Sequence, residues 1–405
     1  MGKGEIGTDR PRRLFVALGP DWGRHPSSLG HLMRVVARTE PVVWINSIAQ
    51  RSPRLTRQDF RRLSEKLWAG LQPRARCERE DRVVVLHPRV LPYHQYGVVR
   101  FLNGRLLGRQ LRPVLSHIKP KSLVLVSTNP AAIALIECLH PDLSCYFCMD
   151  DYAKMSDSDT HLIETCEALM LQRADCVFAT SRTLCTLKST PGRPAVHLPQ
   201  GVDADHFATP APAPKVIADL PRPIIGFHGI VGARVDLDLI EQIAVSFPMA
   251  SVVTVGKIEV NLSRLRRHRN FRAFDAVPYA DLPRWIQSFD IGLVAYRRDG
   301  HTRSVNPLKL LEYLALGIPV VSDDLPELEA HRGHIVTASS RVAYLGAVKR
   351  LIDRYPFPDS ERLERMSYAR SNTWRHRAEQ FLAICDTLWQ KKQEDTPLRR
   401  LSVGS

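Results

Sequence analysis

The sequence predicts an α/β protein with two domains, each built on a parallel sheet that helices cover on both faces. Length is the first observation, because 405 residues are too many for one hydrophobic core. The second is the alternation of short β-branched strands with helical patterns along most of the chain, which is typical of parallel sheets. The third is that a strand running into a glycine loop begins this pattern twice, at residues 12–19 and 224–232.

The first domain is predicted over residues 1–208 and opens with strand, loop, helix and strand. "RRLFVALG" is the strand that runs into a glycine loop, the serines of "SSLGHLMRVVART" can cap a helix, and "PVVWINSI" returns as a strand. Further pairs of strand and helix follow in "SLVLVST" with "NPAAIALIECL", in "LSCYFCMDDY" with "HLIETCEALMLQRA", and in the strand "DCVFATS".

A proline- and alanine-rich stretch, "TPAPAPKVIADLPRP", predicts a stiff linker over residues 209–222, because proline continues neither a helix nor a central strand. The second domain is expected over residues 223–373, with a C-terminal helix and tail over residues 374–405. Its predicted elements alternate as before: "IIGFHGIVG", "VDLDLIEQIAVSF", "ASVVTVGK", "ADLPRWIQSF", "DIGLVAY" and "NPLKLLEYLALGIPVV".

Charge and composition limit the class of protein. A net charge of +15 suggests an acidic partner, namely nucleic acid, an anionic membrane surface or a phosphorylated substrate. No stretch reaches the roughly 20 apolar residues that span a bilayer, so we expect a cytoplasmic protein with a peripheral place on the inner face of the cell membrane. The eight cysteines are scattered, and the C-x-x-C at Cys145 and Cys148 has no second pair, so we expect no metal.

Lys309 and Glu312 lie near the start of the predicted helix in "NPLKLLEYLALGIPVV". Free N–H groups and the positive end of the dipole make a helix start a place where phosphate binds, and a lysine adds a full charge there. A carboxylate on the same side can accept two sugar hydroxyls, as ribose-binding acids do in dinucleotide folds. The alternative is an ion pair between residues three apart on one helix.

"PLKLLEYLALGIPVVSDDLPEL" resembles the nucleotide-sugar-binding motif of GT-B glycosyltransferases, especially the family 4-like enzymes of teichuronic-acid or xanthan type. "YFCMDDY", "LPQGVDADHF", "GFHGIVGARVDLDLI" and "PYADLPRWIQSFDIGLVAY" precede it in the order that this family uses, so the resemblance spans residues 13–322. It implies two Rossmann-like domains facing a cleft. It also implies transfer of a sugar from a nucleoside diphosphate sugar to an acceptor hydroxyl.

The resemblance also implies roles for residues of the second domain. Glu312 stands where the family holds the nucleoside ribose, and Lys309 matches the variant in which a lysine contacts the diphosphate. The loop "FHGIVGAR" resembles the family's diphosphate cradle, although it could be an ordinary turn from strand to helix. The first glutamate of the family's E-x7-E pattern would fall at Ser304, which is not an acid. The predicted donor set is Gly229, Gly232, Arg234, Ser304, Asn306, Lys309, Leu310 and Glu312.

Asp150 and Asp151 end a predicted strand of the first domain and are the candidate catalytic residues. A carboxylate there, and Asp150 first, could take the proton from an acceptor hydroxyl as its oxygen attacks the anomeric carbon. The alternatives are a capping role for Asp151 and a salt bridge for Asp150. The first glycine loop, "GPDWGRHPSSLGH", supplies the predicted acceptor-binding set of Asp21, Arg24, His25 and Ser28.

Other functions remain open at this point. One is a nucleotide-sugar 2-epimerase of the same architecture, another is a nucleic-acid-binding protein with basic runs such as "RLRRHR", and a third is an inactive scaffold of GT-B fold. The basic runs lack interleaved aromatic residues for base stacking, so we expect no nucleic acid. "DLD" at residues 236–238 lies within a predicted helix and is not expected to hold a metal.

The last expectation is a lipid-linked or other glycan acceptor, met at an anionic membrane. Two sets of arginines recur at helical spacing in the first domain, which is typical of a helix that lies on a membrane. A solvated basic face is the alternative. The two sets are Arg54, Arg57 and Arg61, and Arg105, Arg109 and Arg112.

Overall fold

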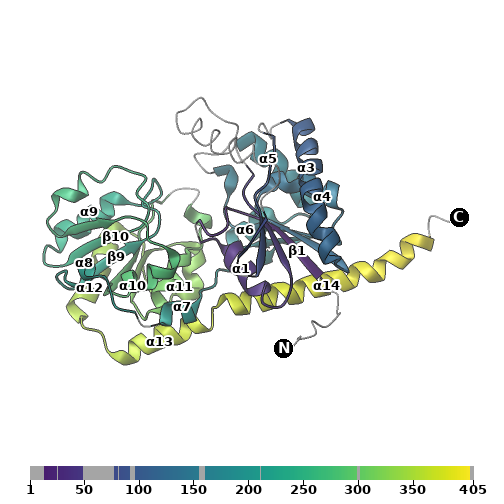
Figure 1. The fold of residues 1–405 in the computed structure, drawn as a ribbon. Helices are drawn as coiled ribbons and strands as arrows, with labels where there is room; N and C mark the ends of the chain where they lie inside the picture. Colours follow the sequence, from purple (N-terminus) through teal and green to yellow (C-terminus); the bar gives the residue numbers. More distant parts are fainter. Residues whose placement is uncertain are drawn as a thin grey trace, which may run out of the picture. The chain divides into compact units, whose positions relative to one another are not determined.

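The computed structural model describes eight stretches of the chain, and they form two compact units. The stretches are residues 13–24, 26–48, 77–80, 82–91, 96–154, 160–209, 211–298 and 302–401. Among the described residues, the first unit takes those up to Thr180, Leu184–Leu198 and those from Ala378 onward. The second unit takes Ser181–Thr183 and Pro199–Arg377. Figure 1 shows the helices and strands of both units.

The first unit contains an eight-stranded sheet in the order β3-β4-β2-β1-β5-β6-β7-β8. All neighbouring strands run parallel except β3, which pairs antiparallel with β4. The strands are β1 (Arg13–Leu18), β2 (Val42–Ile45), β3 (Cys77–Glu80), β4 (Val83–Leu86), β5 (Ser122–Ser127), β6 (Leu143–Cys148), β7 (Cys176–Ala179) and β8 (Val196–His197).

Helices cover both faces of this sheet. One core joins the strands to α3, α4 and α5. On the other face, Phe381 of α14 packs against Phe15 and Phe178, with ring centroids 5.9 and 5.1 Å away. The helices are α1 (Ser28–Val36), α3 (Gly97–Ile118), α4 (Ile133–Leu139), α5 (Thr160–Arg173), α6 (Arg182–Lys188) and α14 (Trp374–Leu401).

The second unit contains a six-stranded sheet in the order β11-β10-β9-β12-β13-β14, and every pair is parallel. One core packs α7, α10, α11 and α13 on the sheet, and another packs α9 and α12 on it (Figure 1). The strands are β9 (Ile224–His228), β10 (Ser251–Val255), β11 (Phe271–Phe274), β12 (Ile291–Val294), β13 (Val320–Asp323) and β14 (Val336–Ala338). The helices are α7 (Ala204–Ala208), α8 (Lys215–Ala218), α9 (Leu237–Ser246), α10 (Leu282–Ile286), α11 (Leu308–Ala315), α12 (Arg341–Arg354) and α13 (Asp359–Arg370).

Both sheets are doubly wound, as the sequence predicts. Their central strands are mostly apolar and, apart from Arg13 at the start of β1, are buried along their whole length, because helices lie on both faces. In each unit the first strands along the chain extend the sheet to one side of its first strand, and the later strands extend it to the other side. The reversal falls between β1 and β5 in the first unit and between β9 and β12 in the second. In open α/β sheets, ligands bind beyond the carboxyl ends of the strands at such a reversal.

The structure adds elements that the sequence analysis did not anticipate. Strands β3 and β4 extend the first sheet at one edge. The predicted linker contains the short helix α8, and Ile217 of this helix is fully buried in a core of the second unit. No helix in the part of the chain that the structure describes has the length and apolarity to cross a membrane.

Candidate active site

The glycine loop of the second unit begins at the end of β9, beside the point where the strand order reverses. Gly229 has a φ of +113°, which suits glycine, and its N–H donates to the carbonyl of Val255 at 2.9 Å. Gly256 follows β10 and touches this loop: a Cβ placed on it would lie 2.0 Å from the Gly229 carbonyl oxygen. Two glycines are therefore needed to bring the two backbones this close.

Lys309 reaches back beneath this loop from the first turn of α11. The helix starts after Pro307, and the Lys309 side chain is almost wholly buried. Its Nζ lies 3.6 Å from the ring centroid of Phe227 and 5.0 Å from that of Tyr296. A Cβ on Gly229 would be 3.2 Å from the same nitrogen. The ammonium group is thus fixed at the carboxyl end of β9 by the faces of two aromatic rings.

Glu312 is buried one turn further along α11, and its partner is a residue that the sequence analysis missed. Its Oε2 lies 3.2 Å from Nε2 of His228, the last residue of β9. The His228 ring stands edge-on to Tyr313, with centroids 4.8 Å apart, and its backbone N–H donates to the Tyr313 hydroxyl at 3.0 Å. A strand-terminal histidine before a glycine loop was the available signal, because ligands bind beyond that end of the sheet.

Burial dominates the charge state of this cluster. Burial lowers the pKa of Lys309 to about 7, against the opposing charge of Glu312, and raises the pKa of Glu312 to about 7. Burial and the charge of Lys309 also hold the pKa of His228 well below its usual value, so the imidazole is neutral. Its Nε2 lacks hydrogen-bond geometry toward any described residue, although it is close to the carboxylate. A ligand that brings negative charge would favour the ammonium form of Lys309.

The other predicted donor residues lie around the same loop and helix. The Gly232 carbonyl accepts from Val235 at 3.0 Å, and the Arg234 carbonyl accepts from the Arg297 backbone at 2.8 Å, which holds the loop in a turn. Ser304 ends a short 3-10 helix and is buried. The Asn306 carbonyl accepts from Gln200 at 3.3 Å. The Leu310 side chain belongs to the hydrophobic core.

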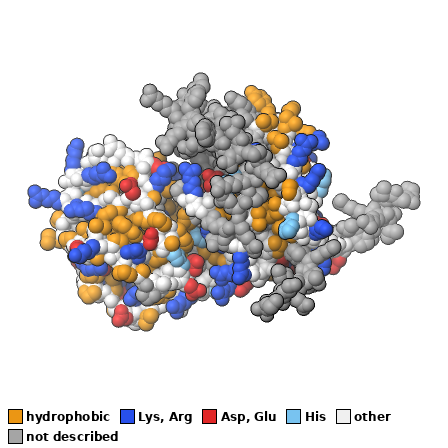
Figure 2. All heavy atoms as spheres, in the orientation of Figure 1, with side chains coloured by type: hydrophobic (Ala, Val, Ile, Leu, Met, Phe, Trp, Pro, Cys, Tyr) orange, Lys and Arg blue, Asp and Glu red, His pale blue; other side chains and the backbone are white. Residues whose placement is uncertain are grey.

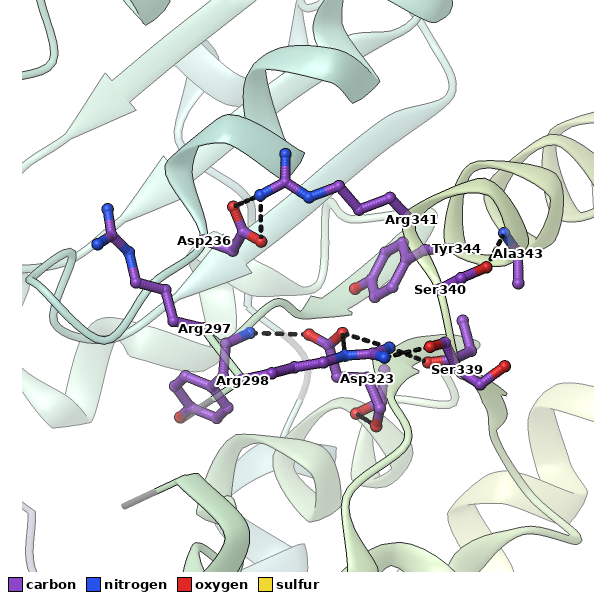
Figure 3. Close-up of polar contacts among 12 residues, drawn as sticks. Asp236, Arg297, Arg298, Asp323, Ser339, Ser340, Arg341, Ala343 and Tyr344 are labelled. Carbon is purple, nitrogen blue, oxygen red and sulfur yellow. Dashed lines mark hydrogen bonds and ion pairs between the residues drawn. The ribbon is translucent and has the colours of Figure 1, made fainter. Parts of the chain in front are cut away.

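A separate polar cavity of about 390 Å³ lies near the carboxyl ends of β12 and β13 and the starts of α9 and α12. Figure 3 shows Arg341 reaching Asp236 and Arg298 reaching Asp323, with distances of 3.0 Å and 3.2 Å in the two ion pairs. Asp236 also caps α9. The carboxylates of this cavity already have cationic partners, and the predicted donor residues do not line it. Its lining is Asp236, Asp238, Leu239, Arg297, Arg298, Asp323 and Arg341.

In the first unit, Asp151 belongs to a buried charge network just beyond β6. It pairs with Lys188 of α6 at 3.3 Å and with Lys154 at 2.8 Å. Lys188 also pairs with Glu167 of α5 at 2.8 Å, and Glu167 accepts from the Tyr146 hydroxyl at 2.7 Å. Burial alone would raise the pKa of Asp151, but the hydrogen bonds and charges of the two lysines outweigh it and lower that pKa. Such a carboxylate is a weak base, which favours a structural role for it.

Asp150 lies half-buried at the same carboxyl end, before the network residue Asp151. Its carbonyl accepts from the Cys148 thiol at 3.4 Å and from the Tyr152 backbone at 3.1 Å, so a tight turn follows the strand. This turn places Asp150 beyond the strand end, where a ligand would be expected. Its catalytic role stays a prediction.

The predicted acceptor-binding residues follow β1, at the reversal point of the first unit. Asp21 accepts from the Ser47 hydroxyl at 2.8 Å, which ties the loops after β1 and β2 together. Arg24 is exposed, 3.5 Å from Asp21. Ser28 is the buried first residue of α1, whose cap is Ser27. His25 lies outside the described residues.

The described residues contain no group of three or more histidine, cysteine or acidic side chains that could hold a metal ion. The expectation that the chain needs no metal stays a prediction. The two residues predicted to contact a diphosphate, Lys309 and Arg234, both have basic side chains.

Comparisons with known proteins find similar sequences and similar folds. A protein family described as "Glycosyl transferase-like" matches residues 238–383. The chain is 28% identical over 295 residues to the Bacillus subtilis (strain 168) protein named "Putative teichuronic acid biosynthesis glycosyltransferase TuaH", which covers 65% of this chain and 73% of that protein.

Solved structures share the fold at low sequence identity. A trehalose-6-phosphate structure from E. coli with bound UDP-2-fluoro glucose is 12% identical, with a TM-score of 0.65, covering 93% of this chain and 99% of that chain. A sucrose-phosphate synthase from Thermosynechococcus elongatus gives 12% identity and a TM-score of 0.67, covering 94% and 100%. Anabaena HepE in complex with UDP and glucose is 11% identical, with a TM-score of 0.61, and the match covers 93% of this chain and 99% of that chain. The family match and the Bacillus relative support glycosyltransferase activity. Together with the shared fold, they confirm the predicted resemblance to the GT-B glycosyltransferases.

Proposed function

We propose that the chain transfers a sugar from a nucleoside diphosphate sugar to a hydroxyl of a lipid-linked or cell-surface glycan precursor. The observation that carries the donor half is the buried group of Lys309, Glu312 and His228 at the reversal point of the second sheet, against the glycine loop. Two structural neighbours bound to UDP with glucose or a fluorinated glucose support this class of donor. The name of the Bacillus relative refers to teichuronic acid biosynthesis, which supports a glycan precursor as acceptor.

Each residue of the donor group has a role that follows from its chemistry. Glu312 accepts hydrogen bonds from two vicinal hydroxyls of the ribose. Lys309, Arg234 and the free N–H groups at the start of α11 offset the negative charge that develops on the leaving diphosphate. His228 contacts the carboxylate of Glu312 and limits where that carboxylate can turn.

The acceptor half of the proposal rests on Asp150. The acceptor oxygen attacks the anomeric carbon, its proton passes to the carboxylate of Asp150, the bond from that carbon to the diphosphate oxygen breaks, and the nucleoside diphosphate leaves. This applies to an inverting reaction. The comparisons support neither an epimerase nor a nucleic-acid-binding protein.

A screen of donors tests the proposal. The purified chain is incubated with UDP-, GDP-, ADP- and CDP-sugars, with and without a membrane lipid extract, and release of nucleoside diphosphate and incorporation of labelled sugar are measured. We expect one class of donor to label the lipid fraction. A C2-epimer formed without acceptor, or no turnover with any donor and a folded protein, would contradict the proposal.

A further inference from the structure

Helix α3 of the first unit has an outward face that is apolar at one end and basic along the rest. Among the described residues, twelve large hydrophobic side chains are exposed, and five of them fall between residues 91 and 102. Val98, Phe101 and Leu102 lie in the first turns of α3, Tyr96 is its N-cap, and Leu91 precedes it. This concentration is unusual, because exposed apolar residues are normally scattered. The five are Leu91, Tyr96, Val98, Phe101 and Leu102, with exposed fractions between 42% and 72%.

The rest of this face is basic. Arg105, Arg109 and Arg112 follow Phe101 at spacings of four, four and three, so they share its side of the helix, and all three are exposed. The guanidinium of Arg105 lies 5.5 Å from the Phe101 ring centroid. The 22 residues of α3 include no aspartate or glutamate. Within the described parts of the chain, none of these three arginines forms an ion pair with a carboxylate. Figure 2 shows hydrophobic and basic side chains side by side over α3.

The opposite face of α3 is fixed, so this exposure does not come from loose packing. A Cβ on Gly104 would lie 2.6 Å from the Ala134 carbonyl oxygen of α4, which shows how closely the two helices approach. Asn103 accepts from and donates to the backbone of Leu91, at 2.7 and 3.0 Å. Gln110 holds the backbone of Arg89 in the same way, at 2.9 Å in both bonds. The outward face is therefore presented on a rigid support.

We propose that this face of α3 docks on an anionic lipid bilayer, with Tyr96, Val98, Phe101 and Leu102 entering the interface and Arg105, Arg109 and Arg112 contacting lipid phosphates. Apolar and aromatic side chains beside a row of arginines without acids fit such a surface in both shape and charge. This inference deepens the proposed function, because a lipid-linked acceptor would be met at the membrane. Only this explanation of why the chain binds a membrane rests on the proposed function.

Co-sedimentation of the full chain with vesicles tests the proposal. Vesicles of phosphatidylcholine alone are compared with vesicles containing phosphatidylglycerol, at low salt and at high salt. The first variant is Val98→Ser with Phe101→Ser, and the second changes Arg105, Arg109 and Arg112 to glutamate. Matched controls in the second unit are Val245→Ser with Met249→Ser, and Arg266, Arg267 and Arg269 changed to glutamate, because these side chains are exposed as well.

We expect the wild-type chain to bind anionic vesicles in a salt-sensitive way. The arginine variant should lose about a hundredfold or more in affinity, since each of its three basic residues near an anionic leaflet changes binding roughly fivefold. The variant with Val98→Ser and Phe101→Ser should lose about tenfold or more, since it removes the apolar area that enters the interface. The controls should change the affinity less than about threefold. Absence of wild-type binding, or equal losses in the controls, would overturn the proposal. Tighter binding to single-stranded DNA than to vesicles, lost in the same α3 variants, would overturn it in favour of nucleic acid.

Two further measurements distinguish a failure of the docking proposal from a failure of the proposed function. Thermal melts of each variant show whether it is folded. Release of nucleoside diphosphate from the donor in the absence of lipid reports on the second unit. Normal vesicle binding with no turnover on any donor would refute the proposed function and leave the docking surface intact. Normal donor turnover with no vesicle binding would do the opposite.

Discussion

Gly256→Ala probes the contact that supports the glycine loop of the proposed donor site. Gly256 has a φ of +150°, and its N–H donates to the Phe274 carbonyl at 3.0 Å. The new Cβ would lie 2.0 Å from the oxygen and 2.6 Å from the carbon of the Gly229 carbonyl. These are backbone atoms, so no flexible side chain can move aside. The loop and the end of β10 must separate by about an ångström or more for the methyl group to fit.

The cost follows from two terms. An alanine at this φ is strained by roughly 1–2 kcal/mol, and overpacking against backbone adds about 1–3 kcal/mol. We therefore expect the variant to lose about 2–5 kcal/mol in the free energy of unfolding of the second unit. Because Gly229 must move, binding of UDP should weaken as well.

Urea denaturation followed by circular dichroism measures the first effect, and titration calorimetry with UDP measures the second. Gly333→Ala is the control, because its Cβ would meet nothing within 4 Å and its φ is not in the strained range. That variant should stay within about 0.5 kcal/mol of wild type. A Gly256→Ala protein as stable as the control, with normal UDP affinity, would refute the reasoning.

Three more predictions concern charged side chains. The raised pKa of Glu312 makes stability fall as pH rises from its unfolded value toward 7, and the lowered pKa of Lys309 makes stability rise with pH above 7. Replacing the pair by Glu312→Leu with Lys309→Met should therefore be neutral or stabilise the fold by about 1–4 kcal/mol near pH 7, as chemical denaturation at pH 5, 7 and 9 would show. Lys188→Met should destabilise the first unit by about 3–5 kcal/mol, because two buried carboxylates lose their shared cation, and adding Glu167→Gln should recover part of the loss in urea melts. Asp150→Asn should lower turnover about a hundredfold or more with unchanged UDP affinity, and near-normal turnover would exclude it as the base.

The fold could be predicted because its signals are local. Apolar strands alternating with amphipathic helices specify a parallel sheet, and "RRLFVALG" and "IIGFHGIVG" mark where each sheet begins. Helix α8 was not predicted, because the prolines around it disfavour a helix. It forms because Ile217 is buried in a core of the second unit. Strand β3 reads Cys-Glu-Arg-Glu and carries no strand pattern, so its antiparallel pairing with β4 determines its place. Strand β4 reads Val-Val-Val-Leu, which is a strand signal that the sequence analysis did not use.

The candidate site was predictable where one segment supplies it. Lys309 and Glu312 share a helix turn, so their proximity follows from spacing alone. Lys309 and Glu312, both within the described part of the chain, do not form the alternative ion pair, because the Glu312 carboxylate points toward His228. That contact joins two elements far apart in the sequence, and so does the support of Gly229 by Gly256. Neither contact can be predicted from the sequence, because each depends on how the strands are arranged in the sheet.

The central claim is that the buried carboxylate of Glu312 binds the nucleoside of the donor, and titration calorimetry of UDP against Glu312→Ala tests it most directly. Glu364→Ala serves as the matched control, because the Glu364 side chain is 68% exposed. We expect Glu312→Ala to weaken UDP binding by roughly 1–3 kcal/mol in a folded protein, since two ribose hydroxyls lose their acceptor, and the control to bind as wild type. A folded Glu312→Ala protein with wild-type affinity for UDP would contradict the account.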